Sequence, residues 1–200
     1  MASSAAAYYQ LASERARLLV TLAGRVSKQS LVLVRTQSIF HAALALHVAS
    51  WEAYIERVIN EFFVATSNPS AIAFNTVHDL LSGRVEKDIK AFNTPNSGNA
   101  RDLILRSTGY DPWPDWNWTV GTLSSLQARQ ALDDALLVRH SFAHGFSIPH
   151  QSWTIQVGGN IYLTKSELQR LDRFLKHLVT ATDRGLSLHI AARFGGSRPW

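Results

Sequence analysis

Two histidines and an arginine lie close together in the stretch Arg139-His140-Ser141-Phe142-Ala143-His144-Gly145. Arginine offers a planar set of N–H donors that suits phosphate oxygens. Imidazole transfers protons near neutral pH, so a histidine serves as a general acid or base. The three side chains are therefore candidates for chemistry at a phosphate group.

The stretch is predicted to end a helix. Apolar residues before and within it recur at spacings of four, three and four, which is one face of a helix: Ala131, Ala135, Val138 and Phe142. Gly145 supplies the residue type that most often stops a helix, and Pro149 follows it. At about 100° per residue, His140 and His144 share a face one turn apart, with Arg139 to one side. The long arginine stem would let its guanidinium swing toward the His144 ring.

The spacing alone does not establish a site. Cations in the last turn of a helix stabilise it against the helix dipole by a few tenths of a kcal/mol. Arginine and histidine recur at similar spacing elsewhere, in Arg35 and His41, Arg170 and His177, and Arg184 and His189. A purely structural role for the three residues therefore stays open.

The wider sequence resembles the HEPN superfamily of ribonucleases. The signature of that superfamily is an arginine, a polar residue and then a histidine at the end of a bundle helix, which Arg139, His140 and His144 match. Further similarity to its RiboL-PSP-type group lies in an earlier helix, at Leu44, Trp51, Glu52 and Tyr54, and in the stretch 182–186.

The resemblance implies the helical-bundle fold of that superfamily and the activity of a metal-independent endoribonuclease. The RNA 2′-hydroxyl attacks the adjacent phosphate and leaves a 2′,3′-cyclic phosphate. His144 would act as general base or acid, Arg139 would stabilise the transition-state charge, and His140 would orient the pair, transfer a second proton or contact phosphate. Two copies would pair about a twofold axis to form one groove, because a single helix end offers no cleft. Proteins of this type often act as toxins or in phage defence, which implies an antitoxin or defence-system partner.

Two other classes of function stay open. In the first, the domain is a non-catalytic HEPN-like module that binds RNA, a nucleotide or a partner protein. Alternatively it is a helical interaction domain whose terminal cations only cap a helix.

The composition favours one domain over residues 1–200 with an anionic partner. The chain has 200 residues, no cysteine and a net charge of +5, which excludes thiolate chemistry and suits nucleic acid. It has neither a phosphate-binding glycine loop nor a His-Glu-x-x-His helix, and we expect no cofactor and no metal. The beginning of the chain lacks the features of a signal peptide, and the run 42–49 is too short to cross a bilayer. We therefore expect a cytoplasmic protein with no membrane partner.

The remaining patterns predict an all-α bundle of four to six helices. The clearest stripe repeats at four and three residues: Leu44, Val48, Trp51, Ile55, Val58 and Phe62. We expect Glu52 on that helix to be a solvated charge, and His41 and His47 to be partly buried, hydrogen-bonded histidines. A loop-rich insertion is expected at about 93–118, held to the bundle by its tryptophans.

A β-hairpin is expected at about 152–164, before the last long helix. Apolar and polar residues alternate on both sides of Gly158-Gly159-Asn160, a typical hairpin turn. Thr164 and Glu167 have the spacing of a capping box for the helix that follows. That helix carries a basic face, which is the predicted approach surface for RNA, at Lys165, Arg170, Arg173 and Lys176.

Overall fold

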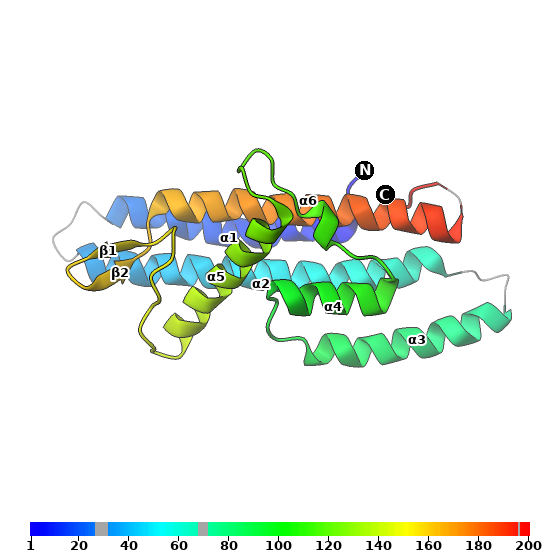
Figure 1. The fold of residues 1–200 in the computed structure, drawn as a ribbon. Coiled ribbons are helices and arrows are strands. Elements are labelled where there is room, and N and C mark those ends of the chain that lie inside the picture. Colours follow the sequence, from blue (N-terminus) through cyan, green and yellow to red (C-terminus); the bar gives the residue numbers. More distant parts are fainter. Residues whose placement is uncertain (27–31, 68–71, 196) are drawn as a thin grey trace.

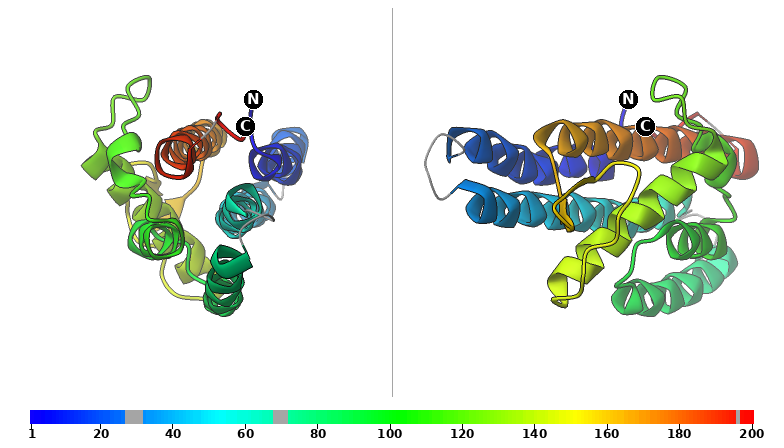
Figure 2. Two further views of the ribbon diagram at one scale, coloured as in Figure 1. Left: turned by 90° about the vertical axis from the view of Figure 1, so that its right-hand side faces the viewer. Right: turned by 60° about the vertical axis from the view of Figure 1, so that its left-hand side comes forward.

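Three long helices run side by side along the molecule and form the centre of an all-α bundle (Figures 1 and 2). The computed structural model describes residues 1–26, 32–67, 72–195 and 197–200. In this part of the chain the helices are α1 (Ser4–Val26), α2 (Val32–Thr66), α3 (Ile72–Ala91), α4 (Ser97–Thr108), α5 (Ser125–Ala143) and α6 (Lys165–Phe194), with a 3-10 turn, η1 (Trp113–Asp115). The predicted fold class is confirmed. No helix among the described residues is both long enough and apolar enough to pass through a bilayer.

The core is built on the apolar stripe of α2, which packs against α1 and α6. All six residues of the predicted stripe are buried. Trp51 is fully buried, lies edge-on to Trp116 at 5.8 Å between ring centroids, and donates from Nε1 to the carbonyl of Pro95 at 3.0 Å. One side chain of α2 thus anchors both the segment before α4 and the segment after it, which is why these loops follow the bundle closely.

The β-hairpin lies where it was predicted, directly before α6. Strands β1 (Ile155–Val157) and β2 (Asn160–Tyr162) pair antiparallel, with Val157 opposite Asn160. Gly158 and Gly159 form the two-residue turn at φ of 56° and 81°, a conformation that L side chains rarely adopt. The hairpin is fastened to α2 by Gln37, whose side chain accepts from Leu163 N at 2.8 Å and donates to Leu163 O at 2.9 Å.

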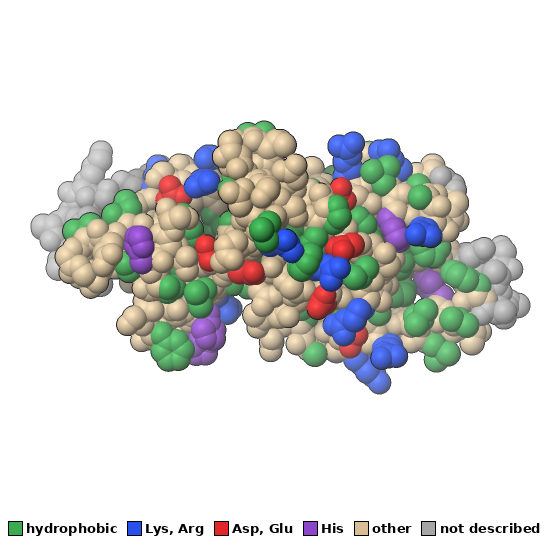
Figure 3. Space-filling model, viewed as in Figure 1, with side chains coloured by type: hydrophobic (Ala, Val, Ile, Leu, Met, Phe, Trp, Pro, Cys, Tyr) green, Lys and Arg blue, Asp and Glu red, His purple; other side chains and the backbone are tan. Residues whose placement is uncertain are grey.

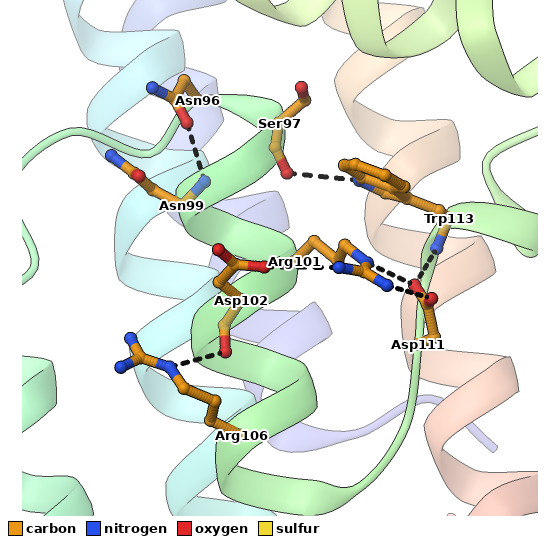
Figure 4. Close-up of polar contacts among 8 residues, drawn as sticks. All are labelled: Asn96, Ser97, Asn99, Arg101, Asp102, Arg106, Asp111 and Trp113. Atoms are coloured by element: carbon orange, nitrogen blue, oxygen red, sulfur yellow. Dashed lines mark hydrogen bonds and ion pairs between the residues drawn. The ribbon is translucent and has the colours of Figure 1, made fainter.

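The tryptophan-rich segment after α4 is structural, as predicted. Trp116 is fully buried and donates from Nε1 to Thr182 Oγ1 of α6 at 2.9 Å. Trp113 is half-buried, with the guanidinium carbon of Arg101 4.4 Å from its ring centroid. Figure 4 shows Arg101 between this ring and Asp111, whose carboxylate accepts from Arg101 Nε at 3.0 Å and Nη2 at 2.7 Å. Arg101 is therefore engaged within the fold.

Helices α5 and α6 begin with different caps. The Ser124 hydroxyl accepts from Gln127 N, and Gln127 Oε1 accepts from Ser124 N at 2.9 Å, so α5 starts with a complete capping box that was not predicted. The box predicted for α6 forms only in part. Thr164 Oγ1 accepts from Glu167 N at 3.3 Å, but Glu167 Oε2 is buried and accepts no hydrogen bond from the described residues.

Gly185 of α6 is expected to tolerate no side chain. A Cβ added there would lie 1.9 Å from the Tyr110 hydroxyl oxygen and 2.5 Å from Asp115 Oδ2. We expect Gly185→Ala to lower the free energy of unfolding by about 1–3 kcal/mol, because Tyr110 must move out of a packed site. Urea denaturation monitored by circular dichroism measures this change.

Gly83 of α3 is the matched control, since a Cβ at that position meets no atom within 4 Å. Alanine is the better helix former, so Gly83→Ala should raise the free energy of unfolding by about 0.5–1 kcal/mol. Equal changes in the two variants would contradict the close approach of Tyr110 to α6.

Candidate active site

The C-terminal end of α5 carries the three candidate residues and stops at the predicted glycine. Gly145 has a φ of 68° and donates to the carbonyl of Phe142 at 3.2 Å, while Phe146 N donates to Ser141 O at 2.8 Å. These two bonds make a Schellman motif, which reverses the chain after the helix. Figures 1 and 2 show α5 crossing the bundle obliquely, so that this end projects beyond the long helices.

The reversal brings Phe146 back onto the two histidines. The ring centroids of His140 and His144 lie 4.3 Å apart, and the Phe146 ring stacks on His144 at 5.8 Å. Both histidines are exposed, and Phe146 is 61% exposed. Figure 3 shows histidine and hydrophobic side chains together on the surface at this end of α5. The structure thus brings the predicted histidine pair together at an accessible position.

Arg139 lies on another side of the helix end than His144. At about 100° per residue it lies about 140° from His144 around the helix axis. It is half-buried, on the side that faces α2, where it interacts electrostatically with Glu52. Among the described residues no hydrogen bond or ion pair engages its guanidinium. One chain therefore presents the arginine and the histidine pair on different sides of the same helix end.

Glu52 is not the solvated charge that the sequence predicted. It is half-buried on α2, and its pKa is raised, mainly by burial and then by Glu56 one turn later, against the opposing effect of Arg139. The pKa of Glu56 is also raised by burial. One signal for this placement is that Glu52 directly follows Trp51, at the centre of the buried stripe. The acidic pair gives the Arg139 side of α5 a polar environment inside the bundle.

A groove of about 550 Å³ lies beside the end of α5, between α2, α5 and the hairpin. Phe142 lines it and stacks on His41 of α2, with ring centroids 4.0 Å apart and ring planes 3° from parallel. His41 is buried, and burial lowers its pKa to about 4. Its Nδ1 has no partner among the described residues, so the predicted hydrogen-bonded histidine is buried but not hydrogen-bonded through that atom.

The predicted basic face of α6 is exposed at all four positions. Among the residues that the structure describes, no three histidine or carboxylate side chains converge on one point that would hold a metal ion. Asp133 is engaged elsewhere, because its carboxylate accepts from Ser97 N at 2.7 Å and from Ser97 Oγ at 2.9 Å.

Comparison of the chain with protein-family models, with curated proteins and with solved structures finds no match. Function is therefore inferred from the residues at the end of α5 and from their geometry.

Proposed function

We propose that this protein is a metal-independent endoribonuclease of the HEPN type, with Arg139, His140 and His144 as its catalytic residues. The observation that carries the proposal is the exposed pair of imidazoles, 4.3 Å apart between ring centroids, directly after an arginine at a helix end. Two adjacent imidazoles allow one ring to take a proton while the other gives one. A helix that needed cations only as caps has no reason to hold two rings in contact at its surface.

The reaction needs no reagent beyond RNA itself. His144, as general base, takes the proton of the 2′-hydroxyl while the 2′-oxygen attacks phosphorus. The bond from phosphorus to the 5′-oxygen breaks, and the protonated imidazole of His140 gives that oxygen its proton. The products are a 2′,3′-cyclic phosphate and a 5′-hydroxyl. Arg139 stabilises the negative charge that builds on the phosphate oxygens in the transition state.

Two copies of the chain are proposed to form the working site. Arg139 and the histidines face different sides of the end of α5, so one copy does not surround a phosphate. A twofold pair would place both sets around one groove, because such an interface presents the same patch twice. Exposed apolar side chains beside the histidines support this, since Leu137 is 48% and Phe146 61% exposed. A role as a toxin or in phage defence, with an antitoxin or defence partner, follows from the resemblance alone.

The alternative is a HEPN-like module that binds RNA without cutting it. The separation of Arg139 from the histidines favours this alternative, because catalysis requires these groups to act on one phosphate. A module of this kind would retain binding to RNA, which the exposed basic face of α6 supports.

The test is cleavage of RNA in excess EDTA. We expect the purified full chain to cut single-stranded RNA under these conditions and to leave 2′,3′-cyclic phosphate ends, read by mass spectrometry of the fragments. RNA binding without cleavage, in a folded dimer, would support the binding module instead. A folded monomer that neither binds nor cuts RNA would leave only the helical interaction domain.

A further inference from the structure

A second site lies away from the candidate active site, in a cavity of about 260 Å³ between α5, α6 and the segment that leads into β1. Arg139, His140 and His144 do not line it. Three aromatic side chains form much of its wall: Trp118, Trp153 and Phe174. Cavities for drug-sized ligands span about 300–1,000 Å³. This one suits a smaller ligand with flat apolar faces, of the size of one fused ring system.

The lining contains one buried donor and one buried acceptor that have no partner among the described residues. Trp153 Nε1 is the donor and Glu167 Oε2 is the acceptor. A glutamate at the third position of a helix ordinarily returns to the cap, but Glu167 does not complete the box with Thr164. The nearest cation, Arg170 Nη1, is 3.9 Å from Glu167 Oε2, which is too far for a hydrogen bond. A buried polar group left unpaired destabilises the fold, so a ligand that pairs with it gains binding free energy.

The charged side chains on the rim of the cavity are acidic on balance. Asp134 and Glu167 contribute two carboxylates, against the single exposed cation of Arg170. Gln130 Nε2 donates to Asp134 Oδ1 at 2.8 Å, so this amide N–H is occupied. The ligand that satisfies the rim must therefore carry several donors, with one acceptor for the Trp153 indole N–H. A phosphate group would be repelled by the two carboxylates.

We propose that this cavity binds a guanine base. The Watson–Crick edge of guanine carries the N1–H and N2–H donors beside the O6 acceptor, so a carboxylate takes the donors and an indole N–H meets O6. Aromatic side chains provide the faces on which unpaired bases stack. Adenine offers one donor group on this edge, and a guanidinium offers no acceptor for Trp153. The base comes either from free guanosine compounds or from a single-stranded RNA; the RNA source rests on the proposed function.

The first test is titration of the full chain with guanosine, inosine and adenosine. The Trp153 indole N–H resonance and the tryptophan fluorescence report occupancy. We expect the affinity to fall in the order guanosine, inosine, adenosine, because inosine lacks the N2 donor and adenosine lacks both N1–H and O6. Glu167→Gln should weaken guanosine binding about 10- to 100-fold, and Trp153→Phe about 3- to 10-fold. Glu14→Gln, at an exposed position on α1, should bind as the wild type does.

Three outcomes would overturn the assignment. They are a folded protein whose Trp153 resonance does not respond to guanosine, equal affinity for adenosine, and displacement of guanosine by arginine amide. To identify the source, guanosine monophosphate is compared with a uridine oligonucleotide that contains one guanosine, using His144→Ala to prevent cleavage. Tighter binding of the oligonucleotide than of the mononucleotide supports RNA as the source, and the reverse supports a free nucleotide.

Failure of this site is distinguishable from failure of the proposed function. Guanosine binding by a chain that does not cut RNA would contradict the proposed nuclease function and support the guanine site. RNA cleavage by a chain that does not bind guanosine would support the nuclease function and contradict the guanine site.

Discussion

Replacing His144 by alanine is expected to lower the rate of RNA cleavage in EDTA by a factor of about 10²–10⁴, which is the usual contribution of a general acid or base. The ring is exposed and forms no part of the core, so the fold should be unchanged. Arg139→Ala should lower the rate by a factor of about 10²–10³, because the charge of the transition state loses its donors. Initial rates on a fluorescent RNA substrate measure both effects.

The matched control is His150→Ala, which removes an exposed histidine six residues further along the chain. This variant should cut RNA at the wild-type rate. Comparable activity in His144→Ala, Arg139→Ala and the wild type would show that any nuclease activity comes from other residues or from a contaminant. Mixing His144→Ala with Arg139→Ala tests the paired site, since a composite site formed from two copies recovers activity when each copy supplies what the other lacks.

The fold is expected to lose stability as the pH falls from about 6.5 to about 4, because of two buried histidines. Burial lowers the pKa of His41 from 6.5 to about 4, and burial also dominates the lowering of the pKa of His47 to about 4. Between these values the unfolded chain binds a proton at each histidine and the folded chain does not. The free energy of unfolding therefore falls as the pH falls through this window, by about 3 kcal/mol for each histidine.

Denaturation in urea at pH 7 and at pH 4 measures this loss. His41→Gln stays neutral at both values, so its loss should be smaller than that of the wild type by about 3 kcal/mol. His47→Gln is a second, independent variant for the same comparison. His150→Gln, at an exposed position, should lose as much stability as the wild type. An equal loss in all four proteins would contradict the buried, neutral state of His41 and His47.

The helices and the hairpin could be predicted because their patterns are local. The stripe from Leu44 to Phe62 repeats at the helical period, and Gly158-Gly159 is a turn that few other residues allow. Gly145 predicted the end of α5 in the same way, because a glycine stop is also a local pattern. Helix α4 begins at Ser97, within the loop-rich insertion predicted at about 93–118, because the Asn96 side chain accepts from Asn99 N at 2.7 Å and caps it. Cap residues are also turn residues, so the sequence alone does not separate the two roles.

The residues of the candidate site could be predicted from the sequence, but the directions in which their side chains point could not. Spacing places His140 and His144 on one face, and the structure has their rings in contact. The spacing does not indicate which face of α5 packs against α2, because that depends on packing between helices far apart in the sequence. Arg139 and Glu52 are 87 positions apart, and their proximity follows from that packing.

The side-chain amide of Gln37 hydrogen-bonds to both the N–H and the carbonyl of Leu163, as the backbone of a neighbouring strand would. A two-stranded hairpin alone is marginally stable in water, but this one is hydrogen-bonded at its base to α2, the longest of the described helices. The hairpin side of the groove beside Phe142 is therefore preorganised. A molecule that binds in this groove contacts a hairpin that is already ordered. The entropic cost of ordering protein backbone therefore weakens its binding only slightly.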